Sequence, residues 1–489
     1  MSPSAAPSPA PNPVEISAAT TAEDIVAIAD GAPVSLSPAS REDVGRMKEA
    51  ADRIGAAHAT YGRSTGVGAN RTTTVSEADD AAAEHGRLLV RSHATDAGTP
   101  LPHRAVRAMA ATRLAQLAQA RSGIDPAVPD ALVAALNADA LPEIGRYGSI
   151  GTGDLAALSA LALALAGERP TSAPLVVPPI RWGADSALPF LSSSALTVAR
   201  GVLASDELRR LDRASRVLYA LAIVAFEGSV EAFSPAAAAA ISAPGVDEVA
   251  AEVRALLRGH DARAARIQDP YGLRVHPITQ AALVTAMVRL DAQLGRLVTA
   301  AQENPMFDAA AGTVTHHGGF YQAQLAGDLD AASLAIARAA TNAHARLRLA
   351  NEPGYTGLRP FLAEGPAGAS GLMMLEYTAA AALAEIRAAA SPASLGTISL
   401  SRGTEEDAGF ATQGVVQLER AVEGYRVVLS CELLSVARLV AQRGATLPPR
   451  LRPLHGALAG LMPEHQDQDL RPPLQAADAL LDGLAEVSP

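Results

Sequence analysis

The sequence predicts an all-helical protein, and three observations support that prediction. Hydrophobic residues make up 49% of the 489 residues, whereas aromatic residues make up only 3%. Alanine and leucine, which supply much of the apolar content, lead the scale of helix propensity, while aromatic and β-branched residues favour strands. Beyond residue 197, apolar residues recur at i, i+3, i+4 and i+7 over long segments with no strand pattern between them. The sequence therefore indicates a bundle of long helices.

The expected helices follow one another with short breaks. The first, TTAEDIVAIADG at 20–31, has threonine at its start, acidic residues in its first turn and glycine at its end, which are start and stop signals of a helix. LAALSALALALAG at 155–167 is apolar throughout, as a core helix is. The other helical segments are expected at 40–59, 82–94, 101–123, 125–142, 197–230, 277–302, 328–351, 372–390 and 412–444.

Charge and cysteine content exclude several classes of protein. The net charge of -11 argues against a nucleic-acid partner, which requires a basic surface. The single cysteine, Cys431, cannot form an intrachain disulfide and suits a reducing compartment. No uninterrupted apolar run reaches the length of a bilayer span, and the N-terminus lacks the basic start and apolar centre of a signal peptide. We therefore expect a cytoplasmic protein, no membrane contact and a disordered Pro/Ser/Ala tail over 1–14.

Several short motifs occur in a fixed order and together resemble one family. They are Tyr61-Gly-Arg-Ser-Thr-Gly-Val-Gly68, Ser92-His-Ala94, Asn137-Ala138 with Pro142, Gly148-Ser-Ile-Gly151 with Gly153-Asp-Leu155, Gln268-Asp-Pro-Tyr-Gly-Leu-Arg274, Glu303-Asn-Pro305, Gly-Gly-Phe at 318–320, Phe361-Leu-Ala-Glu364 and Ser391-Pro-Ala-Ser394. The set resembles the aromatic amino acid ammonia-lyase family, which comprises the histidine and phenylalanine ammonia-lyases and their aminomutase relatives.

The resemblance implies a fold and an assembly. It implies an all-α, ammonia-lyase-like fold in which an N-terminal active-site region, 15–196 here, lies on a central bundle of long antiparallel helices, with the C-terminal helices, at 197–489. It also implies a homotetramer whose active sites are each assembled from more than one subunit. The partner expected in each site is a small carboxylate substrate.

The glycine loop at 148–155 departs from the family pattern. The family has Gly-Ser-(Val/Ile)-Gly-Ala-Ser-Gly-Asp-Leu, whose Ala-Ser-Gly cyclises into an electrophilic methylidene-imidazolone, whereas this chain reads Gly-Ser-Ile-Gly-Thr-Gly-Asp-Leu. Gly151, Thr152 and Gly153 still supply a carbonyl, a β-hydroxyl and an unobstructed glycine nitrogen, but would give a bulkier ethylidene group. Ser192-Ser193-Ser194 stands where the family has Asn-Gly-Thr bracing the group. We therefore expect a degenerate loop and no cofactor.

The resemblance assigns roles to residues around that loop. Tyr61 matches the family's general base for the β-proton, a role for which neighbouring positive charge or donors must stabilise the phenolate. Arg274 matches the arginine that binds the substrate carboxylate, and its planar fork suits that group. The remaining candidates are Tyr271 and Gln268 beside Arg274, Glu406 near the substrate's nitrogen with the register against Glu405 open, Phe320 beneath the cofactor ring, His93 at the substrate side chain, and Ser192 near the cofactor.

Each role has an ordinary structural alternative. Tyr61 could pack as a loop lid, and Arg274 could form an interhelix salt bridge. Glu406 could belong to a solvated acidic run at a helix N-terminus. Phe320 and His93 could be packing residues.

Two other kinds of site are rejected. His316-His317 lacks a third ligand at useful spacing, so no metal is expected. The glycines of 148–153 follow no strand pattern and lack the dinucleotide-binding spacing.

The expected function follows from this set. We expect a lyase, a carbon–nitrogen lyase, that works without the prosthetic group and eliminates an amine or another activated leaving group from an amino-acid-derived carboxylate. Three alternatives stay open: a conjugate-addition cyclase or isomerase of specialised metabolism, an ammonia-lyase or aminomutase with a group derived from Gly-Thr-Gly, and a non-catalytic amino-acid-binding homologue.

Overall fold

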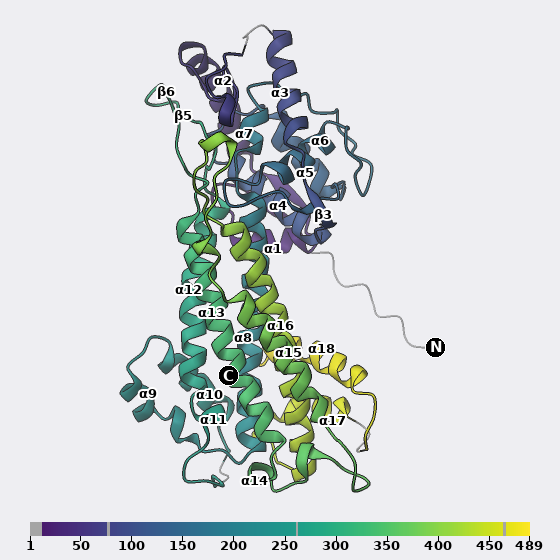
Figure 1. Ribbon diagram of the computed structural model, residues 1–489. Helices are drawn as coiled ribbons and strands as arrows, with labels where there is room; N and C mark the ends of the chain where they lie inside the picture. Colours follow the sequence, from purple (N-terminus) through teal and green to yellow (C-terminus); the bar gives the residue numbers. More distant parts are fainter. Residues whose placement is uncertain (1–11, 76–78, 261–262, 463–465) are drawn as a thin grey trace. The chain divides into compact units, whose positions relative to one another are not determined.

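The computed structural model describes residues 12–75, 79–260, 263–462 and 466–489 (Figure 1). Over these residues the chain is mainly helical, with three small sheets of two strands each. The predicted all-α fold class is confirmed. Residues up to 11 of the predicted tail lie outside the described part, and the first strand begins at Val14.

The chain divides into two compact units. Unit 1 contains Met1–Leu203, Asp291–Gly327 and Ala393–Val415, and unit 2 contains Ala204–Leu290, Asp328–Pro392 and Val416–Pro489. The region predicted at 15–196 therefore belongs to unit 1, together with two segments from much later in the chain. Those segments carry Phe320 and Glu406 into unit 1, whereas Gln268, Tyr271 and Arg274 belong to unit 2.

Unit 1 consists of short helices with three small sheets. Its elements are β1 (Val14–Ile16), α1 (Ala22–Ala29), β2 (Val34–Leu36), α2 (Pro38–Ala57), η1 (Gly68–Asn70), α3 (Asp79–His93), β3 (Ala97–Pro100), α4 (His103–Leu117), α5 (Ala127–Asn137), β4 (Gly145–Tyr147), α6 (Leu155–Leu165), α7 (Ala187–Leu191), β5 (Met306–Asp308), β6 (Thr313–Thr315), η4 (Ala393–Leu395) and η5 (Ser401–Gly403). β1 and β2 pair in parallel, and β3–β4 and β5–β6 pair antiparallel.

Local sequence explains where these helices begin. Before α1, the Asp24 amide donates to Thr21 Oγ1 at 3.2 Å and the Thr21 amide donates to Asp24 Oδ2 at 2.8 Å, a capping box. α6 is buried over most of its length, as its uniformly apolar sequence predicts. The predicted helices at 20–31 and 155–167 are thus confirmed.

Unit 2 is built on long helices. Four helices have residues in both units: α8 (Ala195–Ala225), α12 (His276–Val298), α13 (Ala323–Ala350) and α16 (Ala411–Arg443). The others are η2 (Val230–Phe233), α9 (Pro235–Ile241), α10 (Val246–Leu256), α11 (Tyr271–Arg274), α14 (Pro353–Thr356), η3 (Pro360–Leu362), α15 (Met373–Ala389), η6 (Arg452–Leu454), α17 (His455–Leu461) and α18 (Arg471–Ala485). In unit 2 the long helices lie side by side as a bundle (Figure 1).

Buried polar contacts join the bundle helices. Arg346 of α13 donates through Nη2 to Glu432 Oε2 of α16 at 2.9 Å, and both side chains are fully buried. The Tyr425 hydroxyl of α16 donates to Ser215 Oγ of α8 at 3.0 Å. Because an unpaired buried charge is very costly, these contacts fix the register of the helices as well as their proximity.

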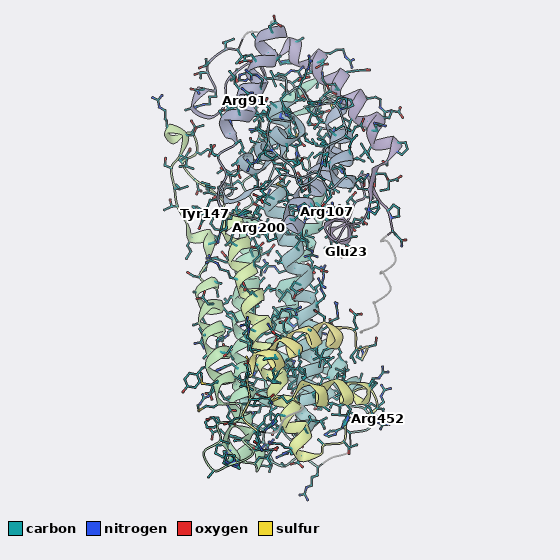
Figure 2. The ribbon with its side chains drawn as sticks, turned by 90° about the vertical axis from the view of Figure 1, so that its right-hand side faces the viewer. Glu23, Arg91, Arg107, Tyr147, Arg200 and Arg452 are labelled. Carbon is teal, nitrogen blue, oxygen red and sulfur yellow. The ribbon has the colours of Figure 1, made fainter. Side chains whose placement is uncertain are left out.

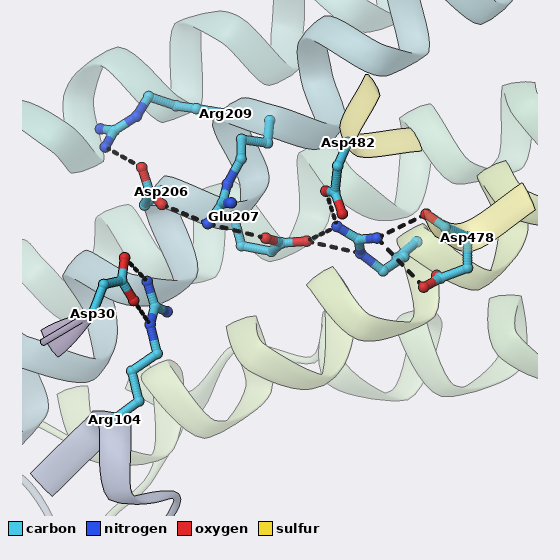
Figure 3. A network of polar contacts seen from close by, with 9 residues as sticks. Asp30, Arg104, Asp206, Glu207, Arg209, Asp478 and Asp482 are labelled. Atoms are coloured by element: carbon cyan, nitrogen blue, oxygen red, sulfur yellow. Dashed lines mark hydrogen bonds and ion pairs between the residues drawn. The ribbon is translucent and has the colours of Figure 1, made fainter. Parts of the chain in front are cut away.

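A network of ion pairs and hydrogen bonds around Arg426 attaches the C-terminal helix to the same bundle. Arg426 of α16 donates to Glu207 of α8 at 2.8 Å and to Asp482 of α18 at 2.7 Å, and its Nη1 donates to the Asp478 carbonyl at 3.1 Å (Figure 3). These acidic neighbours raise the pKa of the Arg426 guanidinium against the opposing effect of its burial. One cation therefore connects three helices.

One segment passes a length and composition test for a membrane span. Ala187–Ala225 contains a window with a mean hydropathy of 1.3, and that window is completely buried within the structure. The sequence-based expectation that no uninterrupted apolar run reaches the length of a bilayer span stands, because this segment includes Ser192-Ser193-Ser194 and Arg200. Burial of the whole window is the behaviour of a core helix.

Protonation of His276 provides a test of the bundle's packing. The ring is buried, stacks on Tyr219 with centroids 4.0 Å apart, and lies near Arg346. Burial, followed by the charges of Arg346 and Arg216, holds the pKa of His276 well below 6.5. Because the unfolded chain then binds a proton that the folded chain does not, the free energy of unfolding should fall as pH decreases below about 6.5, by about 1.4 kcal/mol per pH unit.

The measurement compares urea unfolding between pH 7 and pH 5 for wild type and His276→Gln. The variant should lose less stability over this range, while His455→Gln, at an exposed position of α17, should behave as wild type. An unchanged pH slope in His276→Gln would contradict a buried neutral ring.

Candidate functional site

The loop after α2 holds Tyr61 in a fixed position within unit 1. The Tyr61 amide donates to His316 Nε2 at 3.2 Å, and the Gly68 amide donates to the Tyr61 hydroxyl at 2.7 Å. Gly62 has φ +72°, and a Cβ there would lie 2.1 Å from Leu188 Cδ2, so glycine is required at this turn. The loop folds back so that one of its own backbone amides, that of Gly68, donates to the Tyr61 hydroxyl.

The surroundings of Tyr61 act on its pKa in opposite directions. Burial raises the pKa, the Gly68 amide and Arg71 lower it, and Glu405 raises it further, so that the pKa lies above 10. The positive charge and donor expected from the sequence are present as Arg71 and the amide. They do not outweigh burial and Glu405, so the hydroxyl is a phenol in this arrangement.

A turn from late in the chain packs on this loop. The Ala69 amide donates to Ser401 Oγ at 3.0 Å, and Arg71 Nη1 donates to Thr404 Oγ1 at 2.7 Å. Glu405 is half-buried and acts electrostatically on Tyr61, whereas Glu406 is exposed. Of the two registers left open by the sequence, the structure brings Glu405 rather than Glu406 to the tyrosine.

The glycine loop is bent and held on both sides. Gly151 and Gly153 have φ of +91° and +103°, and a Cβ on Gly151 would lie 2.6 Å from the Phe410 nitrogen. Ser149 Oγ donates to the Gly153 carbonyl at 3.0 Å, and the Phe410 amide donates to the Ile150 carbonyl at 3.1 Å. These contacts require glycine at 151 and leave Thr152 half-buried.

Asp154 anchors this loop to the start of α8 and to the serines before it. Its buried carboxylate accepts the Thr197 amide at 2.8 Å and Thr197 Oγ1 at 3.0 Å, and its own amide donates to the Ser193 carbonyl at 2.7 Å. Burial raises the pKa of Asp154, while the Thr197 contacts oppose that shift. The end of the glycine loop is therefore held by hydrogen bonds to Ser193 and to Thr197 of α8, just before the apolar helix α6 begins.

The three serines lie directly behind this loop. Ser192 Oγ donates to the Asn304 carbonyl at 3.3 Å, and Ser193 Oγ donates to Gln116 Oε1 at 2.5 Å. The Ser194 amide donates to Gln302 Oε1 at 3.0 Å. Ser194 Oγ and Gln302 Nε2 are buried and have no hydrogen-bond partner among the described residues. Polar atoms thus remain available beside the loop.

Phe320 and the histidine pair form a further part of the site. Phe320 Cδ1 lies 4.0 Å from the position that a Cβ on Gly153 would take, and the Phe320 ring lies 6.5 Å from that of His317. His317 Nε2 lies 2.6 Å from the Glu303 carbonyl, and His317 Nδ1 accepts the Gly319 amide at 3.0 Å. Both histidines are therefore used in hydrogen bonds within the protein.

His93 ends α3 on another side of the Tyr61 loop. His93 Nδ1 lies 2.8 Å from the Leu89 carbonyl and 3.1 Å from Ser92 Oγ. The residue lines a cavity of about 510 Å³ together with Gly66 and Val67. This placement suits contact with a substrate side chain.

The predicted carboxylate site forms a group of its own in unit 2. Gln268 is exposed, Tyr271 is 67% exposed, and the Arg274 guanidinium lies 4.3 Å from the centre of the Tyr271 ring. Within the described residues Arg274 forms no ion pair, and its buried Nε has no hydrogen-bond partner. The salt-bridge alternative for Arg274 is therefore not found among the residues that the structure describes.

Sequence reasoning missed several residues of unit 1 that surround Tyr61. They are Arg71, His316, Ser401, Thr404 and Glu405. From the sequence alone, His316 is considered only as a metal ligand and rejected, and Glu405 only as a possible contact of the substrate's nitrogen. His316, Ser401, Thr404 and Glu405 lie more than 250 positions from Tyr61 in the sequence, so no local spacing reveals these contacts, whereas Arg71 lies only ten positions away.

Comparison with known proteins extends over nearly the whole chain. The sequence model of the family described as aromatic amino acid lyase matches residues 20–460. Histidine ammonia-lyase of Anaeromyxobacter sp. (strain K) is 31% identical over 493 residues, covering 94% of this chain and 97% of the relative. Histidine ammonia-lyase of Streptomyces coelicolor is 31% identical over 487 residues, covering 94% of each chain.

Solved structures share the fold. Phenylalanine aminomutase of Pantoea agglomerans superposes with a TM-score of 0.91 at 23% identity, covering 96% of this chain and 99% of the other. Ergothionase of Treponema denticola gives a TM-score of 0.89 at 21% identity, with 97% and 99% covered. At these identities the likeness establishes the fold.

The comparisons overturn the prediction that the prosthetic group is absent. The relatives are histidine ammonia-lyases, and enzymes of this kind use methylidene-imidazolone. The missing residue and the change of serine to threonine do not remove the groups that form the ring. Gly151, Thr152 and Gly153 retain the carbonyl, hydroxyl and glycine nitrogen that cyclisation needs, and the bent loop beside Phe320 and the buried Ser194 hydroxyl fits such a group.

The family match, the relatives and the shared fold agree with the order of the motifs along the chain. The family model covers most of the sequence, and the relatives extend over almost their full length. The chain belongs to the aromatic amino acid lyase family.

Proposed function

We propose that this protein is a carbon–nitrogen lyase that releases ammonia from an aromatic α-amino acid. One Cβ–H bond and the Cα–N bond break, a C=C bond forms, and the products are ammonia and an α,β-unsaturated acid. The cofactor-independent form of this reaction is not retained, because the relatives are ammonia-lyases of the kind that carry the prosthetic group.

The observation that carries the proposal is the convergence of separate segments in unit 1. The Tyr61 loop bonds to His316 and Ser401, and the glycine loop bonds to Phe410. Both loops thus bond to the late segment 401–410, and the Tyr61 loop also bonds to His316. A base and an electrophile held by shared neighbours are what elimination next to a carboxylate requires.

The proposed roles follow from chemistry. Tyr61 removes the β-proton, and Arg274 binds the substrate carboxylate with Tyr271 and Gln268 beside it. Glu405 or Glu406 contacts the substrate's nitrogen. When formed, the prosthetic group supplies an electrophile that assists loss of ammonia. Phe320 and Ser192 support that group, and His93 contacts the substrate side chain.

Formation of the group predicts a change in mass. Cyclisation and dehydration remove two waters, so the intact protein should be lighter than its sequence by about 36 Da, with the deficit in the peptide containing Gly151 and Gly153. Thr152→Ala lacks the hydroxyl that is eliminated and should show no dehydration, while Thr152→Ser should retain the full deficit. An unmodified wild-type mass would contradict formation of the group.

The proposed role of Tyr61 as the base predicts that its substitution lowers activity and that wild-type activity depends on pH. Tyr61→Phe should lower kcat/KM by about 10²–10⁴-fold, measured as ammonia and unsaturated acid released from L-histidine, L-tyrosine and L-phenylalanine. Because the base is the phenolate and its pKa is raised above 10, kcat/KM of wild type should rise with pH through the alkaline range. Glu405→Gln removes a charge that raises this pKa and should move the curve to lower pH.

The control for the tyrosine variants is Tyr147→Phe. Tyr147, labelled in Figure 2, is 62% exposed and contacts Arg146 just before the glycine loop. The kcat/KM of Tyr147→Phe should therefore stay within about twofold of the wild-type value. Including trimethylammonium betaines of the same acids in the assay identifies the leaving group. Full turnover by Tyr61→Phe would overturn its role as the base.

We also infer that the protein is a cytoplasmic homotetramer, as the family resemblance implies. Large apolar side chains are exposed on α12, α13 and α15: Val288 at 63%, Leu334 at 57%, Met374 at 53% and Tyr377 at 63%. Exposed apolar side chains on neighbouring helices are typical of subunit interfaces. Light scattering should give four times the mass of one chain, and a monomer at micromolar concentration would contradict the inference.

A further inference from the structure

The turn that carries Tyr271 and Arg274 is too short to hold its own conformation. α11 has four residues, about one helical turn, and a single turn forms few hydrogen bonds for the backbone that it orders. In an α-helix the Leu273 carbonyl would accept the amide four residues later, but that residue is Pro277, which has no N–H. The turn therefore needs donors from elsewhere in unit 2.

Three successive carbonyls of α11, those of residues 271 to 273, each accept a hydrogen bond from a buried side chain of the bundle. The donors are, in order, Asn342 Nδ2 at 3.2 Å, Arg346 Nη1 at 3.4 Å and the Tyr219 hydroxyl at 2.6 Å. Tyr219 belongs to α8, and the other two belong to α13 (Figure 1). These three residues are called the α11 clamp below.

The α11 clamp is itself held in place by buried contacts. Arg346 Nη1 also donates to Asn342 Oδ1 at 2.7 Å, and Arg346 Nη2 donates to Glu432 Oε2 at 2.9 Å. The Arg346 guanidinium lies 5.5 Å from the centre of the Tyr219 ring. None of the three clamp residues is more than 6% exposed. A Cβ on Gly272 would lie 3.2 Å from the Arg346 nitrogen, so the turn packs directly on α13.

We propose that the α11 clamp positions Arg274 for the substrate carboxylate. The clamp bonds to the backbone of the turn rather than to its side chains, and the Arg274 guanidinium lies over the exposed Tyr271 ring. A bidentate contact with a carboxylate depends on the direction of the guanidinium plane, which changes when the backbone that carries it moves. This inference rests on the proposed function and adds positioning residues that act through Arg274.

Removal of one hydroxyl group tests the clamp. Tyr219→Phe loses the contact with the Leu273 carbonyl and keeps the ring. It should raise KM by about 5–50-fold for whichever of L-histidine, L-tyrosine and L-phenylalanine the wild type turns over best. Because carboxylate binding is made equally in the bound substrate and in the transition state, kcat should stay within about threefold.

Tyr425→Phe is the matched control for general loss of stability. Tyr425 is also a fully buried tyrosine of the bundle, but its hydroxyl donates to Ser215 Oγ rather than to α11. Its KM should stay at the wild-type value. Asn342→Asp cannot donate to the Tyr271 carbonyl but keeps the oxygen that accepts Arg346, and it should raise KM as Tyr219→Phe does. A rise in KM for Tyr219→Phe no larger than that for Tyr425→Phe would overturn the proposal.

A double variant shows whether the clamp acts through Arg274. Arg274→Ala should raise KM by itself, and adding Tyr219→Phe to it should cause no further rise, since the guanidinium that the clamp positions is then gone. A rise that multiplies in the double variant would mean that Tyr219 acts on substrate binding by another route, and would refute the positioning role.

Hydrogen exchange separates this inference from the proposed function. The amides of residues 271–276, followed by mass spectrometry, should exchange faster in Tyr219→Phe than in wild type or Tyr425→Phe. Faster exchange with a wild-type KM in Arg274→Ala would support the clamp on the turn and overturn the carboxylate role of Arg274 in the proposed function. Unchanged exchange with a raised KM in Arg274→Ala would leave that role intact and exclude the clamp.

Discussion

The buried ion pair between Arg113 and Glu303 is the constraint on which the candidate site of unit 1 depends. Nη1 of Arg113 lies 3.0 Å from Glu303 Oε1, and neither side chain is more than 1% exposed. Burial raises the pKa of Glu303, and attraction to Arg113 opposes that shift. Such a pair is tolerated only when further hydrogen bonds satisfy it, and Arg113 Nε donates to the Phe190 carbonyl at 3.0 Å. The need for these contacts therefore fixes the position of the backbone around Phe190 and around Glu303.

Both reactive loops rest on the backbone that this pair fixes. The segment after Phe190 contains Ser193, whose carbonyl binds the Asp154 amide at the end of the glycine loop. The carbonyl of Glu303 itself lies 2.6 Å from His317, next to the histidine that accepts the Tyr61 amide. This buried charge pair thus acts as the common support of the Tyr61 loop and of the glycine loop, and rigid surroundings of this kind position the side chains of a site.

The sequence predicted those parts of the molecule that local patterns encode. Helical spacing located the long helices, and motif order identified the family and Tyr61. It could not show that Glu405 is half-buried and Glu406 exposed, because burial depends on the course of the preceding turn, in which Ser401 and Arg402 have φ of 50° and 55°. The prediction that the prosthetic group is absent was wrong, because Gly151, Thr152 and Gly153 keep the carbonyl, the hydroxyl and the glycine nitrogen in spite of the missing residue.

The raised pKa of Tyr61 can be reconciled with its role as a base by the charge of the substrate. Glu405 is one of the groups that raises this pKa, because its negative charge disfavours a nearby phenolate. An amino-acid substrate carries an ammonium group, and such a cation placed beside Glu405 would offset the negative charge. The phenolate would then become easier to form only when substrate is bound, while Arg71 and the Gly68 amide already favour it. A phenol at rest and a phenolate in the complex would confine strong basicity to the occupied site.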